Sequence, residues 1–401
     1  MSKRALAHLK VVELCGLVSG PYCTKLLADL GAEVIKIEPP PGDKARRRGP
    51  FLKNTPHPEL SGLFLHLNTS KLGVTLDVGT ETGRTILREL VKQAHVFVED
   101  NPPGIMQELG LGYEHLEALN PRLVMTSITP FGQTGPYRDY KAYELNSFHA
   151  GGEGYLLPLH SYEPDREPVK AGGIVGDCAC GLSSAVATLS AVYLAAATGM
   201  GQHIDVSKQD VLMSLVQNHV CTYANLEEVH SRIRRGFLLV LPMECKDGYI
   251  IITIVTNREW ESLKQVMGNP SWADDERFSS WVGRHLYGDD INPRVQEWVR
   301  QFAKQELFHK VQSYGVVAVP VATAEDLANS PQLKARGFFV EVEHQIAGRL
   351  RYPASAYDFS ETPSTMGRAA PLLGQHNDSI YCERLGYSRE DLVLLRESGV
   401  I

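Results

Sequence analysis

Asp177 is the residue whose position best suits chemistry in this sequence. It follows a glycine-rich turn, AGGIVG at 171–176, and precedes an apolar stretch at 178–198 that has no charge and no proline. Glycines let a backbone and a ligand approach each other closely. An Asp directly before a helix is also a favoured N-cap, which stabilises the helix by about 1 kcal/mol. The residues alone therefore leave two roles open for Asp177, a helix cap and a reactive carboxylate.

The stretch at 178–198 predicts a long helix. About 20 apolar residues are enough to cross a bilayer. However, Cys180, Gly181 and several hydroxyl side chains interrupt the stretch, and no basic flank follows it. Small residues suit a helix that packs tightly inside a large protein. We therefore expect a packed helix that stops at Gly199, a strand at 201–207, and no membrane span.

Two runs around this helix, GDCACG at 176–181 and TGMGQHIDVSKQD at 198–210, resemble the signature of the family III CoA-transferases. That group includes formyl-CoA, carnitine and benzylsuccinate CoA-transferases, with alpha-methylacyl-CoA racemase as a relative. The resemblance covers nearly the full chain. It implies that Asp177 is the catalytic carboxylate and that two subunits thread through each other as an interlocked dimer.

The rest of the chain reads as alternating strands and helices. Strands are expected at 9–15, 32–38, 73–78, 95–100 and 122–132, and helices at 21–31, 80–93 and 105–118. Alternation of this kind predicts an α/β fold, a Rossmann-like parallel sheet covered on both faces. We expect a large domain at 1–205, a linker helix at 206–228, a smaller α+β domain at 229–335, and a return to the large domain at 336–401.

The first strand–helix–strand unit is where a nucleotide would bind. Glu38 ends the second strand at the distance where a dinucleotide enzyme holds a ribose, about 20 residues on, but the G-x-G-x-x-G fingerprint is missing. In the family, the pattern GPYCTKLLADLGAEVIKIEPPPGD at 20–43 opens the CoA-binding domain. We expect Ser19 or Gly20 to cap the helix, and Val18 in the preceding turn to contact coenzyme A.

A basic loop follows the second strand and carries Lys44, Arg46, Arg47 and Arg48. Such a cluster is either solvated surface or, just beyond a parallel strand, a place for an anionic ligand. Coenzyme A carries a 3′-phosphate and a diphosphate, so Arg46, Arg47 and Arg48 are candidate contacts. Lys71, in a segment that resembles the family's N-x-x-K-x-x-x-x-L-D, is a further phosphate candidate.

Two later segments extend the resemblance. Lys141, Tyr143 and Glu144 match the K-x-Y-E motif of formyl-CoA transferases, which implies a Lys on a CoA phosphate and a Glu beside the catalytic Asp. Asp100 and Asn101 replace the Asn and Phe that the family places against CoA.

Racemases have a His at the position of Tyr143 and a carboxylate where this chain has Thr256. Removing and returning an α-proton needs two proton carriers, so the pattern counts against a racemase.

Composition excludes other classes. A net charge of −7 argues against a general nucleic-acid binder. Seven scattered cysteines predict reduced thiols in a cytoplasm. The N-terminus has no apolar signal segment, and Cys178-x-Cys180 at a helix start is typical of packing rather than of a metal site.

A carboxylate is ionised at neutral pH and needs no general base. Asp177 would attack an acyl-CoA to give a mixed anhydride, and the CoA thiolate would return to give an aspartyl-CoA thioester that an acceptor acid resolves. We expect CoA and acyl-CoA as substrates, no permanently bound cofactor, succinyl-CoA as donor, and an aromatic or branched acceptor such as benzylsuccinate, because the segment at 236–241 is apolar. The alternatives are an acyl-CoA racemase or isomerase, a CoA-binding subunit of a heteromer rather than a homodimer, and a nicotinamide dehydrogenase.

Overall fold

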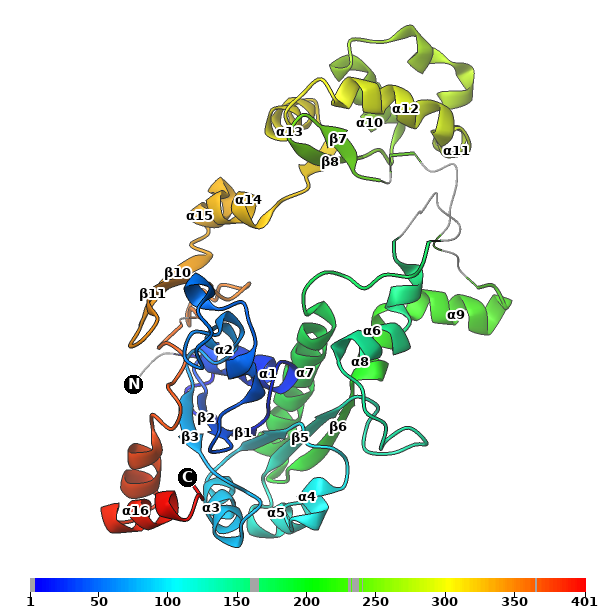
Figure 1. Cartoon of the computed structure of the whole chain (residues 1–401). Coiled ribbons are helices and arrows are strands. Elements are labelled where there is room, and N and C mark those ends of the chain that lie inside the picture. The colour runs from blue at the N-terminus through cyan, green and yellow to red at the C-terminus, as the bar shows by residue number, and fades with distance from the viewer. Residues whose placement is uncertain (1–3, 159–165, 230–231, 233–237, 240, 365) are drawn as a thin grey trace. The chain divides into compact units, whose positions relative to one another are not determined.

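The computed structural model describes residues 4–158, 166–229, 232, 238–239, 241–364 and 366–401 (Figure 1). The chain forms two compact units, and it enters the second unit twice. Unit 1 consists of Met1–Gly154, Lys170–Cys221 and Lys334–Ile401, and unit 2 consists of Tyr155–Val169 and Thr222–Leu333. Asp177 and its bonded partners Ser19 and Lys208 belong to unit 1.

Unit 1 is built on a six-stranded sheet in which every strand pair is parallel. Its order is β3-β2-β1-β4-β5-β6, with strands β1 (Lys10–Leu14), β2 (Glu33–Glu38), β3 (Leu72–Thr75), β4 (Val96–Glu99), β5 (Val124–Thr129) and β6 (Gln202–Ser207). The predicted Rossmann-like sheet is confirmed. Since the chain builds outward from β1 in both directions, the order reverses between β1 and β4, and ligands bind at such a point outside the carboxyl ends of the strands.

Helices cover both faces of the sheet. One core cluster joins Val11 and Val34 to helices α1 (Ser19–Asp29) and α7 (Val175–Thr198). The other joins Val12 and Ile35 to α3 (Glu81–Lys92) and α5 (Tyr113–Leu119). Successive strand residues point to opposite faces, so neighbouring valines of β1 enter different cores. Figure 1 shows α1 and α7 side by side, and their residues are in contact along both helices.

The remaining helices of this unit differ in places from the expected ones. The helix expected at 105–118 is two helices, α4 (Ile105–Glu108) and α5, because Gly110 has a φ of 66° that a continuing helix cannot accept. The linker helix is likewise two helices, α8 (Lys208–Leu215) in unit 1 and α9 (Gln217–Leu226), which passes from unit 1 into unit 2 after Cys221. The others are α2 (Gly62–Leu67), α6 (Glu144–Ala150) and α16 (Arg389–Glu397), and in α15 (Pro331–Ala335) the chain passes from unit 2 back to unit 1 after Leu333.

By length and composition alone, α7 is apolar enough to cross a membrane. In the structure its inner face packs against α1, α8 and the sheet, and that face includes the polar side chains of Asp177, Ser184 and Thr188. This arrangement is the packed helix that the small residues predicted.

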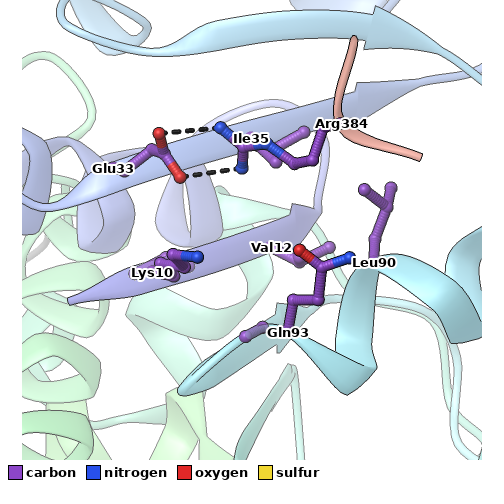
Figure 2. Close-up of a pocket in the computed structure, with 9 residues that line it drawn as sticks. Lys10, Val12, Glu33, Ile35, Leu90, Gln93 and Arg384 are labelled. Carbon is purple, nitrogen blue, oxygen red and sulfur yellow. Dashed lines mark hydrogen bonds and ion pairs between the residues drawn. The ribbon is translucent and has the colours of Figure 1, made fainter. Parts of the chain in front are cut away.

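The last part of the chain returns to β3. A hairpin of β10 (Phe339–His344) and β11 (Gly348–Pro353) precedes it. The Tyr381 hydroxyl donates to the Thr75 carbonyl at 2.7 Å, and the Asp77 N–H donates to the Val400 carbonyl at 2.7 Å. Arg384 makes two bonds of 2.8 Å to the Glu33 carboxylate (Figure 2). The tail therefore forms part of the core of unit 1.

The cavity beside that ion pair, drawn in Figure 2, lies at the amino-terminal edge of the sheet, next to the first residues of β1 and β2. Its volume is about 10 Å³, room for one water molecule at most. It is therefore no site for a substrate, and the opposite, carboxyl edge holds the candidate chemistry.

Unit 2 contains a three-stranded antiparallel sheet, β7 (Met243–Cys245), β8 (Gly248–Thr253) and β9 (Val317–Pro320), in that order. Its helices are α10 (Asn257–Val266), α11 (Trp281–Leu286), α12 (Gly288–Val299), α13 (Lys304–Ser313) and α14 (Ala324–Asn329). Trp260 is buried among Ile, Leu and Val side chains of this unit. Three of the six residues of the apolar segment at 236–241 (236, 237 and 240) lie outside the described residues.

Candidate active site

Asp177 is the third residue of α7, not its N-cap. The helix begins at Val175 and the capping position falls on Ile174. The Asp177 carboxylate instead accepts a hydrogen bond of 2.9 Å from the Ser19 hydroxyl and an ion pair of 2.8 Å from the Lys208 ammonium. The cap interpretation was wrong in its register, because α7 begins at Val175, two residues before Asp177. The Asp177 carboxylate is therefore bonded to side chains of α1 and α8 and does not cap its own helix.

Ser19 reaches Asp177 because α1 and α7 approach unusually closely. A Cβ atom added at Gly181, one turn after Asp177 in α7, would lie 2.6 Å from the Ser19 carbonyl oxygen. Only a glycine permits that separation. Ser19 was expected to cap α1, but the cap position is Val18 and Ser19 is the first helical residue. Its hydroxyl is thus free to donate to Asp177.

Three loops bring further groups to the same edge of the sheet. Gly16 follows β1, Asp100 follows β4 and Lys208 follows β6. The Gly16 N–H donates to both oxygens of the Asp100 carboxyl group at 3.1 Å. This contact joins the ends of β1 and β4, the point where the strand order reverses. The site therefore lies where an open α/β sheet binds its ligand.

The electrostatics of this edge are set by one cation and two acids. Burial lowers the pKa of Lys208, but the carboxylates of Asp177 and Asp100 outweigh it, and the pKa is raised overall. Burial raises the pKa of Asp100 to about 8, with Lys208 and the Gly16 N–H opposing it. At neutral pH, Lys208 is therefore an ammonium, and Asp100 mostly holds its proton.

Glu144 lies beside the turn that carries Asp177. A Cβ atom added at Gly176 would lie 3.4 Å from a carboxylate oxygen of Glu144. The Lys170 ammonium binds that carboxylate at 3.0 Å and also donates to the carbonyls of Ala171 and Gly173, at 2.8 and 2.5 Å. The structure thus brings Asp177 and Glu144 together, and Lys170 ties Glu144 to the glycine turn.

Two of the predicted phosphate ligands, Arg46 and Lys71, have other partners. Arg46 is 1% exposed and binds Glu38 at 2.6 and 2.8 Å and Glu59 at 2.7 Å. Lys71 is fully buried and binds Glu13 at 2.9 Å, besides a side-chain oxygen and a carbonyl. A buried charge keeps its ion-pair partner because losing it is costly. In this arrangement both side chains are buried in ion pairs with acids of unit 1.

The other predicted CoA contacts differ in access. Arg47, Arg48, Lys141 and Tyr143 are exposed, as is Lys44. Val18 is buried as a whole residue. Asn101 is half-buried and donates to the Glu99 carboxylate at 2.8 and 3.2 Å. The exposed cations are therefore the groups best placed to meet phosphates.

Sequence reasoning missed Ser19, Lys170 and Lys208 as partners of the two acids. For Lys208 a signal was present, because it comes directly after the strand expected at 201–207 and the carboxyl ends of parallel strands meet at one edge. Among the residues that the structure describes, no group of three or more His, Cys, Asp or Glu side chains is arranged to hold a metal ion.

Comparison with known proteins identifies a family for the chain. Residues 6–377 match the family described as CoA-transferase family III. The succinyl-CoA–D-citramalate CoA-transferase of Chloroflexus aurantiacus is 31% identical over 99% of this chain and 98% of its own length. The BbsE subunit of succinyl-CoA:(R)-benzylsuccinate CoA-transferase from Thauera aromatica is 32% identical over 98% of each chain.

Among solved structures, a CAIB/BAIF family protein from Brucella suis superimposes with a TM-score of 0.83 at 32% identity, over 94% of this chain and 98% of the other. Sequence and structure agree over almost the full length. The chain belongs to CoA-transferase family III.

Proposed function

We propose that this CoA-transferase moves CoA from an acyl-CoA to a free carboxylic acid through a covalent intermediate on Asp177. The observation that carries the proposal is the setting of this carboxylate, which is held by Ser19 and Lys208 in the first turn of α7 at the ligand-binding edge of the sheet. An ionised, oriented carboxylate is a nucleophile for a thioester without any base.

The reaction balances without ATP or an oxidant. The Asp177 carboxylate attacks the thioester carbonyl, and the C–S bond breaks to give a mixed anhydride and CoA thiolate. The thiolate attacks the Asp177 carbonyl, giving an aspartyl-CoA thioester and the donor acid as its carboxylate. The acceptor carboxylate then reverses both steps. The first-turn N–H groups of α7 have no partner within the helix and favour the negative charge that develops on each carbonyl oxygen.

For CoA binding we propose Arg47, Arg48 and Lys141 as phosphate contacts, with the turn at Val18 and the loop at Asn101 beside the ligand. The exposure of the three cations supports this assignment. Glu144 is proposed to act beside Asp177, where its carboxylate lies against the turn that precedes the nucleophile.

We propose succinyl-CoA as the donor and an aromatic or branched dicarboxylic acid, such as benzylsuccinate, as the acceptor. Two relatives at about one-third identity are named as succinyl-CoA enzymes that act on such acids. Seven cysteines, all without a disulfide, support a reducing cytoplasm as the site of action. A homodimer is the proposed assembly.

The test is trapping of the intermediate. The protein is incubated with succinyl-CoA, treated with hydroxylamine or borohydride, and digested for mass spectrometry. We expect a modified Asp177 in the wild type, and neither modification nor turnover in Asp177→Asn, which keeps the size of the side chain. Asp205→Asn is the matched control, since the Asp205 carboxylate accepts hydrogen bonds from the Gln133 N–H, away from Asp177. Retained turnover in Asp177→Asn would exclude the proposed nucleophile.

A second candidate is a subunit that binds CoA and supports a paralogous partner, because one relative is named as a subunit of such an enzyme. It predicts CoA binding without transfer in the lone chain. Full exchange activity of the purified chain, with no second polypeptide present, would rule it out.

The position of Thr256 at the start of α10 argues against the racemase alternative. This residue caps α10 together with Glu259 in a capping box, with bonds of 2.8 and 3.2 Å. It therefore has a role in the helix, and neither it nor the exposed Tyr143 supplies a proton carrier of the kind α-proton exchange needs. Solvent deuterium entering the α-carbon of an acyl-CoA, in the absence of any acceptor acid, would revive this alternative.

A further inference from the structure

We infer that the Lys208 ammonium binds the carboxylate of the free acid, both the acid released from the donor and the acceptor acid. Once Asp177 is acylated, this carboxylate replaces Asp177 as the counter-ion of Lys208. The inference rests on the proposed function, because it requires an acylated Asp177. It assigns a role to a side chain for which the sequence analysis had none.

The position of Lys208 suits this exchange. It is the first residue of α8, directly after β6, and its ammonium lies 2.8 Å from one Asp177 oxygen. In the described part of the chain this is its only ion pair. The side chain is about one-fifth exposed, so it is shielded from bulk water and still open on one side. A small anion arriving at Asp177 would meet this ammonium.

Charge conservation gives the reason for an exchange. Before and after the reaction, Asp177 carries the negative charge. In the acylated states Asp177 is neutral, and the charge lies on the thiolate or on the free carboxylate. In the free enzyme the Asp177 and Asp100 carboxylates raise the pKa of Lys208 above its usual value despite burial. Acylation of Asp177 removes the first of these charges, and a carboxylate that arrives at the ammonium replaces it. A shielded ammonium without a counter-ion is costly, so the acylated enzyme favours an anion at this point.

The neighbours of Lys208 do not supply that anion. The groups that face it are Asp177 and Cys180 from α7 and Asp100 from the end of β4. Burial raises the pKa of the Cys180 thiol to about 12 and that of the Asp100 carboxyl to about 8. Both are therefore mostly neutral at pH 7. In the aspartyl-CoA state, where no thiolate is present, the free acid is left as the anion that completes the pair.

The test uses the exchange of labelled succinate into succinyl-CoA, which needs no knowledge of the acceptor. Lys208→Met removes the ammonium and keeps the length of the chain, and Lys208→Arg keeps the charge. A lost charged hydrogen bond weakens binding by roughly ten- to a hundred-fold. We expect the succinate concentration at half-maximal exchange to rise by that factor in Lys208→Met and by less than about five-fold in Lys208→Arg.

The control is Lys264→Met, which removes an ion-paired lysine of α10 far along the chain and is expected to leave the half-maximal concentration unchanged. If Lys208→Met does not fold, as judged by circular dichroism, Lys208→Gln replaces it. A purely structural role would lower the maximal exchange rate and leave the succinate dependence unchanged, and that result would overturn the inference.

Trapping separates the two proposals. Wild-type protein that exchanges no label and forms no ester on Asp177 would refute the proposed function itself. Wild-type and Lys208→Met proteins that both form the ester, with the same dependence on succinate, would refute only the role of Lys208.

Discussion

Gly181→Ala tests whether the close approach of α1 and α7 holds the nucleophile in place. The new Cβ atom would lie 2.6 Å from the Ser19 carbonyl oxygen and 3.1 Å from the Tyr22 side chain, whereas ordinary contacts begin near 3.4 Å. The helices must therefore separate by about 0.8 Å, the difference between 3.4 and 2.6 Å. A shift of that size along the Ser19–Asp177 bond would lengthen it from 2.9 Å past the range of a hydrogen bond.

The expected effect on stability is small and the effect on activity is large. Alanine is favoured over glycine inside a helix by about 1 kcal/mol, while overpacking costs about 1 to 3 kcal/mol. The net loss in the free energy of unfolding is therefore about 0 to 2 kcal/mol. A misplacement near 1 Å at a reacting group can lower the rate by about a hundred-fold. We expect kcat for succinate exchange to fall by roughly ten- to a hundred-fold.

The assay pairs exchange kinetics with urea unfolding. Ser190→Ala, on the exposed side of the same helix, is the control for a new alanine in α7. Ser19→Ala removes the hydrogen bond to Asp177 without pushing the helices apart, and we expect a smaller loss than in Gly181→Ala. A Gly181→Ala protein with kcat within two-fold of the wild type would refute the argument that this contact positions Asp177.

Two further predictions concern charge. Ionisation of Asp100 near pH 8 places a second carboxylate beside Lys208, so exchange should decline as pH rises through about 8, and Asp100→Asn should remove that decline in a pH–rate profile. Since the folded state binds the Asp100 proton more tightly than the unfolded state, the wild type should lose stability as pH rises from about 4 to 8, and Asp100→Asn should gain stability relative to it. A pH–rate profile of Asp100→Asn identical to that of the wild type would argue against the role of Asp100. The double variant Arg47→Ala, Arg48→Ala should weaken the binding of CoA more than that of dephospho-CoA in calorimetry, with the melting temperature unchanged. Equal losses of affinity for both ligands would place the 3′-phosphate elsewhere. Arg46→Met, in contrast, should lower the free energy of unfolding by about 3 to 5 kcal/mol, because it leaves buried acids unpaired.

Much of the fold followed from local pattern. The alternation of apolar runs and amphipathic helices predicted the parallel sheet and its two covered faces, because each run records which faces of its own element are buried. Helix boundaries were less certain. Gly110 divides an expected helix, and the start of α7 moved Asp177 from the cap to the third position.

The site was harder to predict, because its partners are distant in sequence. Arg46 and Lys71 have the composition of phosphate ligands, and nothing near them in the sequence shows that Glu59 and Glu13 neutralise them. Lys208 meets Asp177 only after β6 is placed at the edge of the sheet. Residue type indicates which chemistry is possible, whereas the tertiary contacts decide which charges remain available.

The bonds that tie the tail to β3 have a consequence for biosynthesis. Residues 377–400 contribute Tyr381, Arg384 and the Val400 carbonyl to the core of unit 1, yet the ribosome makes them after the whole of unit 2. During synthesis the sheet of unit 1 is therefore incomplete, with one face of β3 uncovered, until more than half of the chain has been made after β3. A nascent chain of this enzyme is most exposed to aggregation and to chaperones during that interval.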